Sequence, residues 1–105
     1  MIDQLGRPGA KPATGGTITR DITITNKRGL HARASAKFVQ CVELYQAQVS
    51  VTKGPDTVGG TSVMGLMMLA AGPGSRITVT AKGYEARECL DALEGLLSEK
   101  FGEEE

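Results

Sequence analysis

The chain has 105 residues, which is enough for one domain with a modest hydrophobic core. Its twelve Lys and Arg residues balance twelve Asp and Glu residues, and zero net charge is not typical of a general nucleic-acid binder. No apolar run approaches the ~20 residues of a membrane span, and the N-terminus lacks the continuous apolar region of a secretory signal. We therefore expect a cytoplasmic monomer that binds neither nucleic acid nor membrane.

The first half of the chain predicts a tail, a strand, a helix and two further strands. Residues 1–16 are rich in Gly and Pro, which predicts a disordered tail. From Thr17 onward, isoleucines alternate with threonines as in a half-buried strand. A loop then leads to a helix predicted over residues 32–45, with one apolar face formed by Ser35, Phe38, Val39 and Val42. Residues 49–52 and 57–58 predict two strands joined by a turn.

The second half predicts a helix, a strand and a last helix. Residues 63–71 form a short apolar helix with Ser62 or Thr61 as N-cap, stopped by Gly72-Pro73-Gly74. Residues 76–81 alternate as a strand, and residues 85–97 carry the apolar stripe of an amphipathic helix. The acidic tail over residues 101–105 is expected to fray. The order β-α-β-β-α-β-α predicts an α+β domain over residues 17–100, with helices on one face of a mainly antiparallel sheet.

The only histidine, His31, lies at the predicted start of the first helix. Four basic residues surround it in the sequence: Lys27, Arg28, Arg33 and Lys37. A helix N-terminus with basic neighbours suits an anion such as phosphate, and neutral imidazole is a nucleophile near neutral pH. The alternative is that His31 is a surface or capping residue and that Arg33 is a solvated charge.

Two segments carry a family resemblance. Residues 24–33, ITNKRGLHAR, resemble the active-site sequence of HPr, the phosphocarrier of the bacterial phosphoenolpyruvate-dependent phosphotransferase system. Residues 61–67, TSVMGLM, resemble the segment around the regulatory serine of that family. The resemblance implies an HPr-like open-faced β-sandwich, with a four-stranded antiparallel sheet and three helices on one face. Many members have proline where Ala34 stands, but alanine is a good helix former, so we expect the helix to persist.

The resemblance also implies a function. His31 would accept a phosphoryl group on Nδ1 from phospho-Enzyme I and pass it to an EIIA-type protein, in sugar uptake or in nitrogen-type regulation. Arg33 would contact that phosphate. The protein would then be a carrier with a transient phosphohistidine rather than an enzyme. Ser62 resembles the serine that a dedicated HPr kinase/phosphorylase modifies, and this role is compatible with helix capping.

A partner-binding surface is expected beside His31, with Val63, Met64, Met67 and Lys37 as its candidate residues. The alternative is that the side chains of the apolar helix belong to the core. The alternative function is a regulatory HPr-like binding module whose phosphorylation state controls partner proteins. A hydrolase with His31 as base is disfavoured, because the sequence places no Ser, Cys or supporting carboxylate near it.

The sequence predicts neither a cofactor nor a metal site. One histidine and two distant cysteines, Cys41 and Cys89, do not fit a metal-ligand spacing. Both cysteines lie among apolar residues on predicted helices. We expect buried free thiols in a reducing compartment.

Overall fold

The computed structural model describes residues 16–103, so residues 1–15 of the predicted disordered tail lie outside the described part. The elements in chain order are β1 (Thr17–Thr23), α1 (Ala32–Val42), β2 (Gln48–Lys53), β3 (Asp56–Gly59), α2 (Val63–Met68), β4 (Arg76–Lys82), α3 (Ala86–Ser98) and a short 3₁₀ turn, η1 (Lys100–Gly102). The predicted β-α-β-β-α-β-α order is confirmed. Within residues 16–103, no helix has the length and apolar character needed to cross a membrane.

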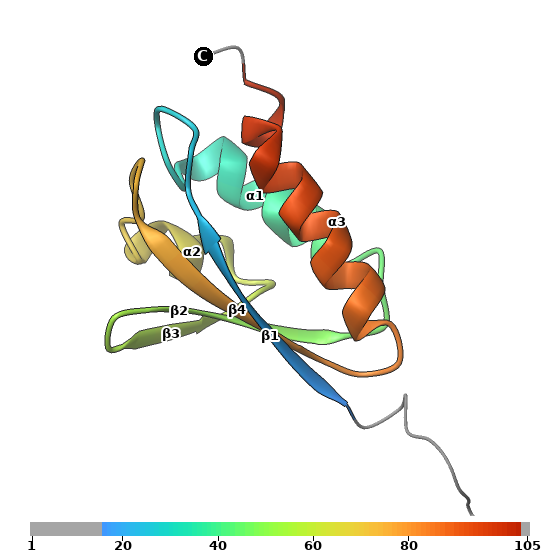
Figure 1. The fold of residues 1–105 in the computed structure, drawn as a ribbon. Helices are drawn as coiled ribbons and strands as arrows, with labels where there is room; N and C mark the ends of the chain where they lie inside the picture. The colour runs from blue at the N-terminus through green and yellow to red at the C-terminus, as the bar shows by residue number, and fades with distance from the viewer. Residues whose placement is uncertain (1–15, 104–105) are drawn as a thin grey trace, which may run out of the picture.

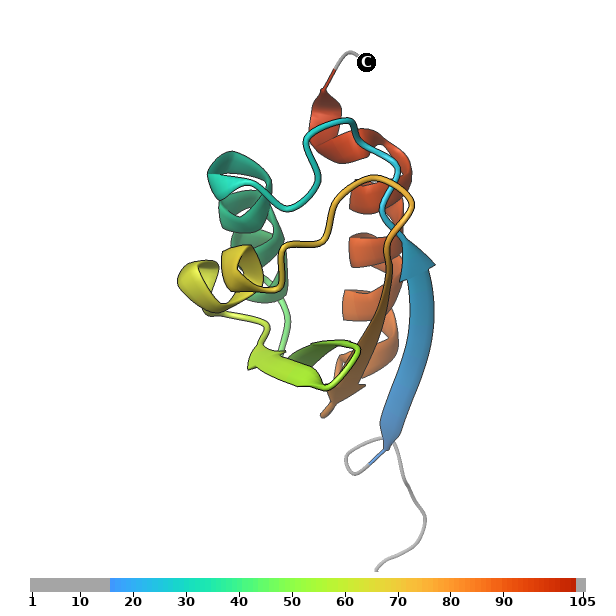
Figure 2. The same ribbon diagram turned by 90° about the vertical axis from the view of Figure 1, so that its left-hand side faces the viewer.

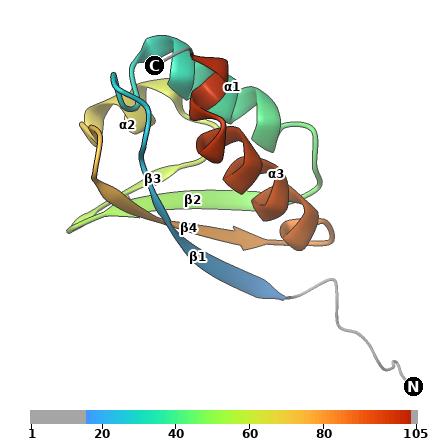
Figure 3. The same ribbon diagram turned by 45° about the horizontal axis from the view of Figure 1, so that its top comes forward.

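The four strands form one antiparallel sheet in the order β1-β4-β2-β3. Figures 1 and 3 show the three helices over one face of this sheet. The alternation of β4 explains the layering, because Ile77, Val79 and Ala81 are fully buried while the residues between them are more exposed. On threonine-rich stretches of the sheet, hydroxyls pair across strands, as between Thr19 and Thr80 at 3.2 Å. The predicted open-faced sandwich is confirmed.

The core lies between the sheet and the helices. The predicted face of α1 is confirmed, since Ser35, Phe38, Val39 and Val42 are all buried. Leucines from α3 pack beside it, and their positions follow the predicted apolar stripe. This packing holds the N-terminus of α1 and the C-terminus of α3 at the same end of the molecule, as Figure 2 shows.

The two cysteines are free thiols on α1 and α3. Cys89 is buried as expected, whereas Cys41 is only half-buried. Burial is the main cause that raises the pKa of the Cys89 thiol to about 11, so this thiol stays protonated near neutral pH.

Two helices end earlier than the sequence predicts. α1 stops at Val42 rather than Tyr45, because the chain tightens into a turn in which the amide of Tyr45 donates to the carbonyl of Val42 at 3.1 Å. α2 stops at Met68, and Ala70 adopts a left-handed conformation with φ of 53° before Gly72 is reached. Helical periodicity continues through both turns, so the sequence pattern does not show where the chain leaves the helix.

The expectation that the chain frays after Lys100 is wrong for residues 101–103. Phe101 is only 1% exposed and belongs to the core cluster. Lys100 and Phe101 both have φ of 57°, so the backbone turns back over the domain in the left-handed region. The Lys37 ammonium donates to the Phe101 carbonyl at 2.6 Å, which ties this turn to α1.

Candidate functional site

The loop before α1 fixes the position of His31. Gly29 has φ of 65°, and a Cβ atom at this position would overlap the carbonyl oxygen of Ala71. The next amide, that of Leu30, donates to the same oxygen at 3.0 Å. His31 then adopts the extended conformation of an N-cap, with φ of −76° and ψ of −179°, and its side chain makes no capping hydrogen bond. The imidazole is therefore available for other contacts at the helix start.

The first turn of α1 offers backbone donors. The first helical hydrogen bond of α1 runs from the amide of Ser35 to the carbonyl of His31 at 2.9 Å. The amides of Ala32, Arg33 and Ala34 precede that bond and have no intrahelical acceptor. The helix begins at Ala32 although alanine stands at position 34, as predicted. An anion next to His31 would meet these N–H groups and the positive end of the helix dipole.

A carboxylate that the sequence analysis missed contacts His31. Glu103 Oε2 lies 2.5 Å from His31 Nε2, and each side chain is 15% exposed. The other oxygen, Oε1, accepts a hydrogen bond from Asn26 Nδ2 at 3.2 Å. Asn26 is buried and also donates from Nδ2 to the Gly29 carbonyl at 2.8 Å. The amide orientation of Asn26 follows from this arrangement, since its NH₂ group faces two acceptors.

Charge and hydrogen bonding favour the ionised form of Glu103. The hydrogen bond from His31 is the main cause that lowers the pKa of Glu103 below its usual value, and Asn26 and the charge of Arg28 act in the same direction. Glu103 is thus a carboxylate near neutral pH and accepts the proton of Nε2. The expectation that no carboxylate supports His31 is wrong, because Glu103 lies 72 residues further along the chain.

The surrounding basic residues have different roles. Arg33 is exposed, and within residues 16–103 it forms no ion pair. Lys37, a predicted partner-binding residue, donates to the Phe101 carbonyl and so ties the C-terminal turn to α1. Arg28 and His31 line a shallow pocket of 220 Å³ together with residues 70–72. An imidazole and free helix amides at the start of α1, with the exposed guanidinium of Arg33 two residues further along the chain, are suited to a phosphoryl group.

Within residues 16–103, no serine or threonine hydroxyl and no cysteine thiol is hydrogen-bonded to the His31 ring. The hydroxyl of Ser35 donates to the Leu30 carbonyl at 3.2 Å, so it does not pair with the imidazole. Residues 16–103 also hold no group of three or more His, Cys, Asp or Glu side chains placed to bind a metal ion. The carboxylate–imidazole pair therefore has no serine or cysteine partner of the kind a hydrolytic triad needs.

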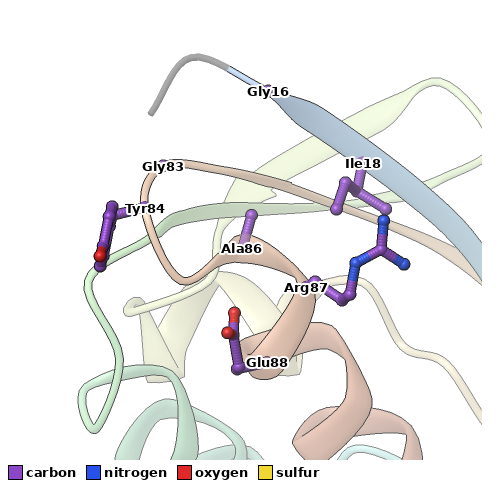
Figure 4. A pocket seen from close by; sticks show the side chains of 7 residues that line it. All are labelled: Gly16, Ile18, Gly83, Tyr84, Ala86, Arg87 and Glu88. Atoms are coloured by element: carbon purple, nitrogen blue, oxygen red, sulfur yellow. The ribbon is translucent and has the colours of Figure 1, made fainter. Parts of the chain in front are cut away.

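A separate pocket lies at the other end of α3. It has a volume of 380 Å³ and is lined by Gly16, Ile18, Gly83, Tyr84, Ala86, Arg87 and Glu88 (Figure 4). These residues lie at or just before the start of β1, in the loop between β4 and α3, and in the first turn of α3, whereas Glu103 follows the end of α3. This pocket is not part of the histidine site.

α2 presents methionines to solvent. Met64, Met67 and Met68 are 69%, 39% and 77% exposed, and we call these three residues the methionine surface. Leu66 and Leu69 are buried, and Val63 is half-buried against the core. The core interpretation therefore applies to the leucines and in part to Val63, while the surface interpretation applies to Met64 and Met67. The exposure of Met68 could not be predicted, because periodicity in a fully apolar helix does not show which side is exposed.

Ser62 caps α2 as predicted. Its Oγ accepts a hydrogen bond from the amide of Gly65 at 2.9 Å, and its backbone has the extended conformation of an N-cap. Ser62 is exposed, so its hydroxyl is accessible from solvent.

Comparison with known proteins identifies the family. The family model described as "PTS HPr component phosphorylation site" matches residues 18–99. The phosphocarrier protein HPr of Cupriavidus necator is 47% identical over 88 residues, covering 84% of this chain and 99% of the relative. The phosphocarrier protein NPr of Shewanella violacea is 40% identical over 86 residues, covering 82% of this chain and 94% of the relative.

Solved structures agree with this match. The crystal structure of HPr-C-His from Thermoanaerobacter tengcongensis superposes with a TM-score of 0.80 at 39% identity, covering 84% of this chain and 99% of that one. The HPr of Bacillus anthracis gives a TM-score of 0.74 at 38% identity, covering 77% and 96%. With its sheet order, its histidine at the start of α1 and these matches across residues 18–99, the chain belongs to the HPr family of phosphocarrier proteins of the phosphotransferase system.

Proposed function

We propose that His31 accepts a phosphoryl group on Nδ1 from phospho-Enzyme I and passes it to an EIIA-type protein. The observation that carries this proposal is the placement of the imidazole: Nε2 is engaged by Glu103, and within residues 16–103 no hydrogen bond occupies Nδ1. The free amides of the first turn of α1 begin at the next residue. The relatives, which are named phosphocarrier proteins HPr and NPr, support the same role.

The chain's own groups supply position and charge. The lone pair of Nδ1 forms a bond to phosphorus while the bond between phosphorus and the donor breaks, and the electron pair of that bond stays with the donor. Such a transfer needs in-line positioning and stabilisation of the equatorial oxygens more than covalent help. The helix amides and the Arg33 guanidinium provide donors for those oxygens.

The acceptor belongs either to sugar uptake or to nitrogen-type regulation. The relatives include proteins named HPr and one named NPr, and the chain matches both at 40% identity or more. A purely regulatory HPr-like module would not need the nucleophile, whereas this chain has His31, with Arg33 two residues further along. We further propose that the protein acts in the cytoplasm as a monomer and as a carrier rather than as an enzyme.

One experiment tests the carrier role. The protein is incubated with Enzyme I and phosphoenolpyruvate, and its intact mass is measured before and after mild acid. We expect one phosphate that the acid removes, as for phosphohistidine. Uptake of an acid-stable phosphate, or of none, would contradict the proposal.

The methionine surface is proposed as a docking surface for Enzyme I. A Met67→Glu change places a charge in an apolar contact, and we expect the affinity for Enzyme I to fall about tenfold, as for a hot-spot residue. The measurement is calorimetric titration. Tyr84→Glu is the matched control, because Tyr84 is also a large exposed side chain, 65% exposed, but lies in the loop before α3. Native affinity in a folded Met67→Glu protein would exclude this surface from docking.

Ser62 is proposed as a regulatory site for an HPr kinase/phosphorylase. Ser62→Asp keeps a capping oxygen but adds a charge, so we expect normal stability and slower phosphorylation of His31, because the docking surface of Enzyme I is acidic in this family. Ser62→Asn is the matched neutral control and should transfer normally. Ser62→Ala should lower the free energy of unfolding by ~1 kcal/mol and leave transfer nearly normal.

For the Ser62 variants, the rate of phosphoryl transfer to His31 is measured by rapid-quench assays at low and moderate salt, and stability is measured by thermal unfolding. The difference between Asp and Asn should shrink as salt screens the charge. Equal transfer rates for Asp and Asn at low salt would leave capping as the role of this side chain.

A further inference from the structure

We propose that Glu103 is a positioning residue for His31. Its carboxylate holds the imidazole in the tautomer with the proton on Nε2, so that the lone pair that attacks phosphorus is the one on Nδ1. This inference rests on the proposed phosphocarrier function, but its first test does not depend on it.

The geometry of the pair carries the argument. Glu103 Oε2 lies 2.5 Å from His31 Nε2, within hydrogen-bonding distance, and the acceptor is an ionised carboxylate. A carboxylate has no proton to donate near neutral pH, so the shared proton belongs to Nε2 in the neutral ring. The second carboxylate oxygen is fixed by buried Asn26, which limits rotation of the Glu103 carboxylate. A hydrogen bond to one ring nitrogen sets the state of the other.

The C-terminal turn η1 positions the Glu103 carboxylate beside His31. The buried Phe101 ring anchors the chain, and Lys37 holds the Phe101 carbonyl. Lys100 and Phe101 adopt left-handed conformations, each of which costs about 1 kcal/mol for a residue with a side chain. Burial of the Phe101 ring and the hydrogen bond from Lys37 hold the chain in these unfavourable backbone conformations, so the turn is an ordered part of the fold and not a frayed end. Its result is that Glu103 points back at the start of α1.

Glu103 also suits the charge that develops during transfer. When Nδ1 bonds to phosphorus and Nε2 keeps its proton, the ring becomes a phosphorylated imidazolium with a positive charge. The Glu103 carboxylate then faces a full charge on the ring instead of a partial one, so it stabilises the product and the transition state more than the resting protein. Arg28 lies near both side chains, and its positive charge cannot supply this stabilisation.

The first measurement is a long-range ¹H–¹⁵N correlation spectrum of the uniformly ¹⁵N-labelled protein. The spectrum is recorded across a range of alkaline pH until the ring signals no longer change with pH, so that the neutral ring is observed. His31 is the only histidine, so its two ring nitrogens are the only imidazole signals. We expect a protonated Nε2 and an unprotonated Nδ1. An equal mixture of tautomers, or a protonated Nδ1, in the parent protein would overturn the proposal.

Two substitutions separate positioning from packing. Glu103→Ala removes the acceptor, so we expect a mixture of tautomers and transfer from Enzyme I slowed about tenfold, as for loss of a charge-assisted hydrogen bond. In Glu103→Gln, the donor from Asn26 selects the side-chain oxygen and turns the amide NH₂ toward His31 Nε2. We expect this variant to protonate Nδ1 and to transfer more slowly than Glu103→Ala, although glutamine has nearly the shape of glutamate. A merely structural role predicts the opposite order.

Glu99→Gln is the matched control, because it removes one negative charge at the end of α3 without changing the contact with His31. It should keep the parent tautomer and transfer rate. Faster transfer in either Glu103 variant would show that the carboxylate blocks His31 and would overturn the proposal. The expected tautomers in a parent protein that takes up no phosphate would instead contradict the proposed function and leave the positioning role in place.

Discussion

A His31→Ala protein should take up no acid-labile phosphate from phospho-Enzyme I. His31 is the only histidine of the chain, so no second imidazole can substitute for it. The fold should persist, because the His31 side chain is not part of the core cluster and its capping role uses the backbone, so the change removes the bond to Glu103 without opening the core. The measurement is intact mass after incubation with Enzyme I and phosphoenolpyruvate, with thermal unfolding as the check on the fold.

The parent protein treated with mild acid is the control for this experiment. Acid should return its mass to that of the unmodified chain, whereas a phosphate on Ser62 would survive. Acid-labile phosphate that persists on the His31→Ala protein would remove the carrier role from this residue.

An Arg33→Ala protein should transfer phosphate about a hundredfold more slowly, which is typical of losing one donor to a developing charge. The exposed guanidinium contributes little to the resting protein, so stability should stay within about 0.5 kcal/mol of the parent. The measurement pairs rapid-quench transfer rates with denaturant unfolding. The effect should appear in transfer both from Enzyme I and to the acceptor, because the same oxygens are stabilised in each direction.

Arg33→Lys is the conservative control. It keeps the charge but loses the planar fork, so its rate should lie between those of the parent and Arg33→Ala. If Arg33→Ala transfers at the parent rate, the amides of Ala32, Arg33 and Ala34 stabilise the phosphoryl group by themselves, and the guanidinium is a solvated surface charge.

The sequence predicted the elements and their layering because these depend on local patterns. The alternation around Ile22 and the stripe of α3 identify buried faces with periods of 2 and 3.6 residues, and both faces are buried in the structure. The ends of α1 and α2 were predicted too late. Apolar periodicity continues past Val42 and Met68, and only packing decides where the chain turns.

The local parts of the site also follow from the sequence. Gly29, His31 and the start of α1 lie within a few residues of one another, and Ser62 caps α2 three residues from its donor, Gly65. Short sequence separation leaves few arrangements, so residue types at fixed spacing are enough to predict a helix N-terminus beside an imidazole.

What only the tertiary structure decided is the partner of that imidazole. Glu103 is 72 residues from His31 and lies in a segment that its acidic composition predicts to fray. Its position depends on burial of Phe101, on the ammonium of Lys37 and on the packing of α3 beside α1. A contact between distant residues is set by the packed core as a whole, and no local pattern encodes it. The sequence alone therefore determined the nucleophile and its helix, and the fold determined which ring nitrogen is left free.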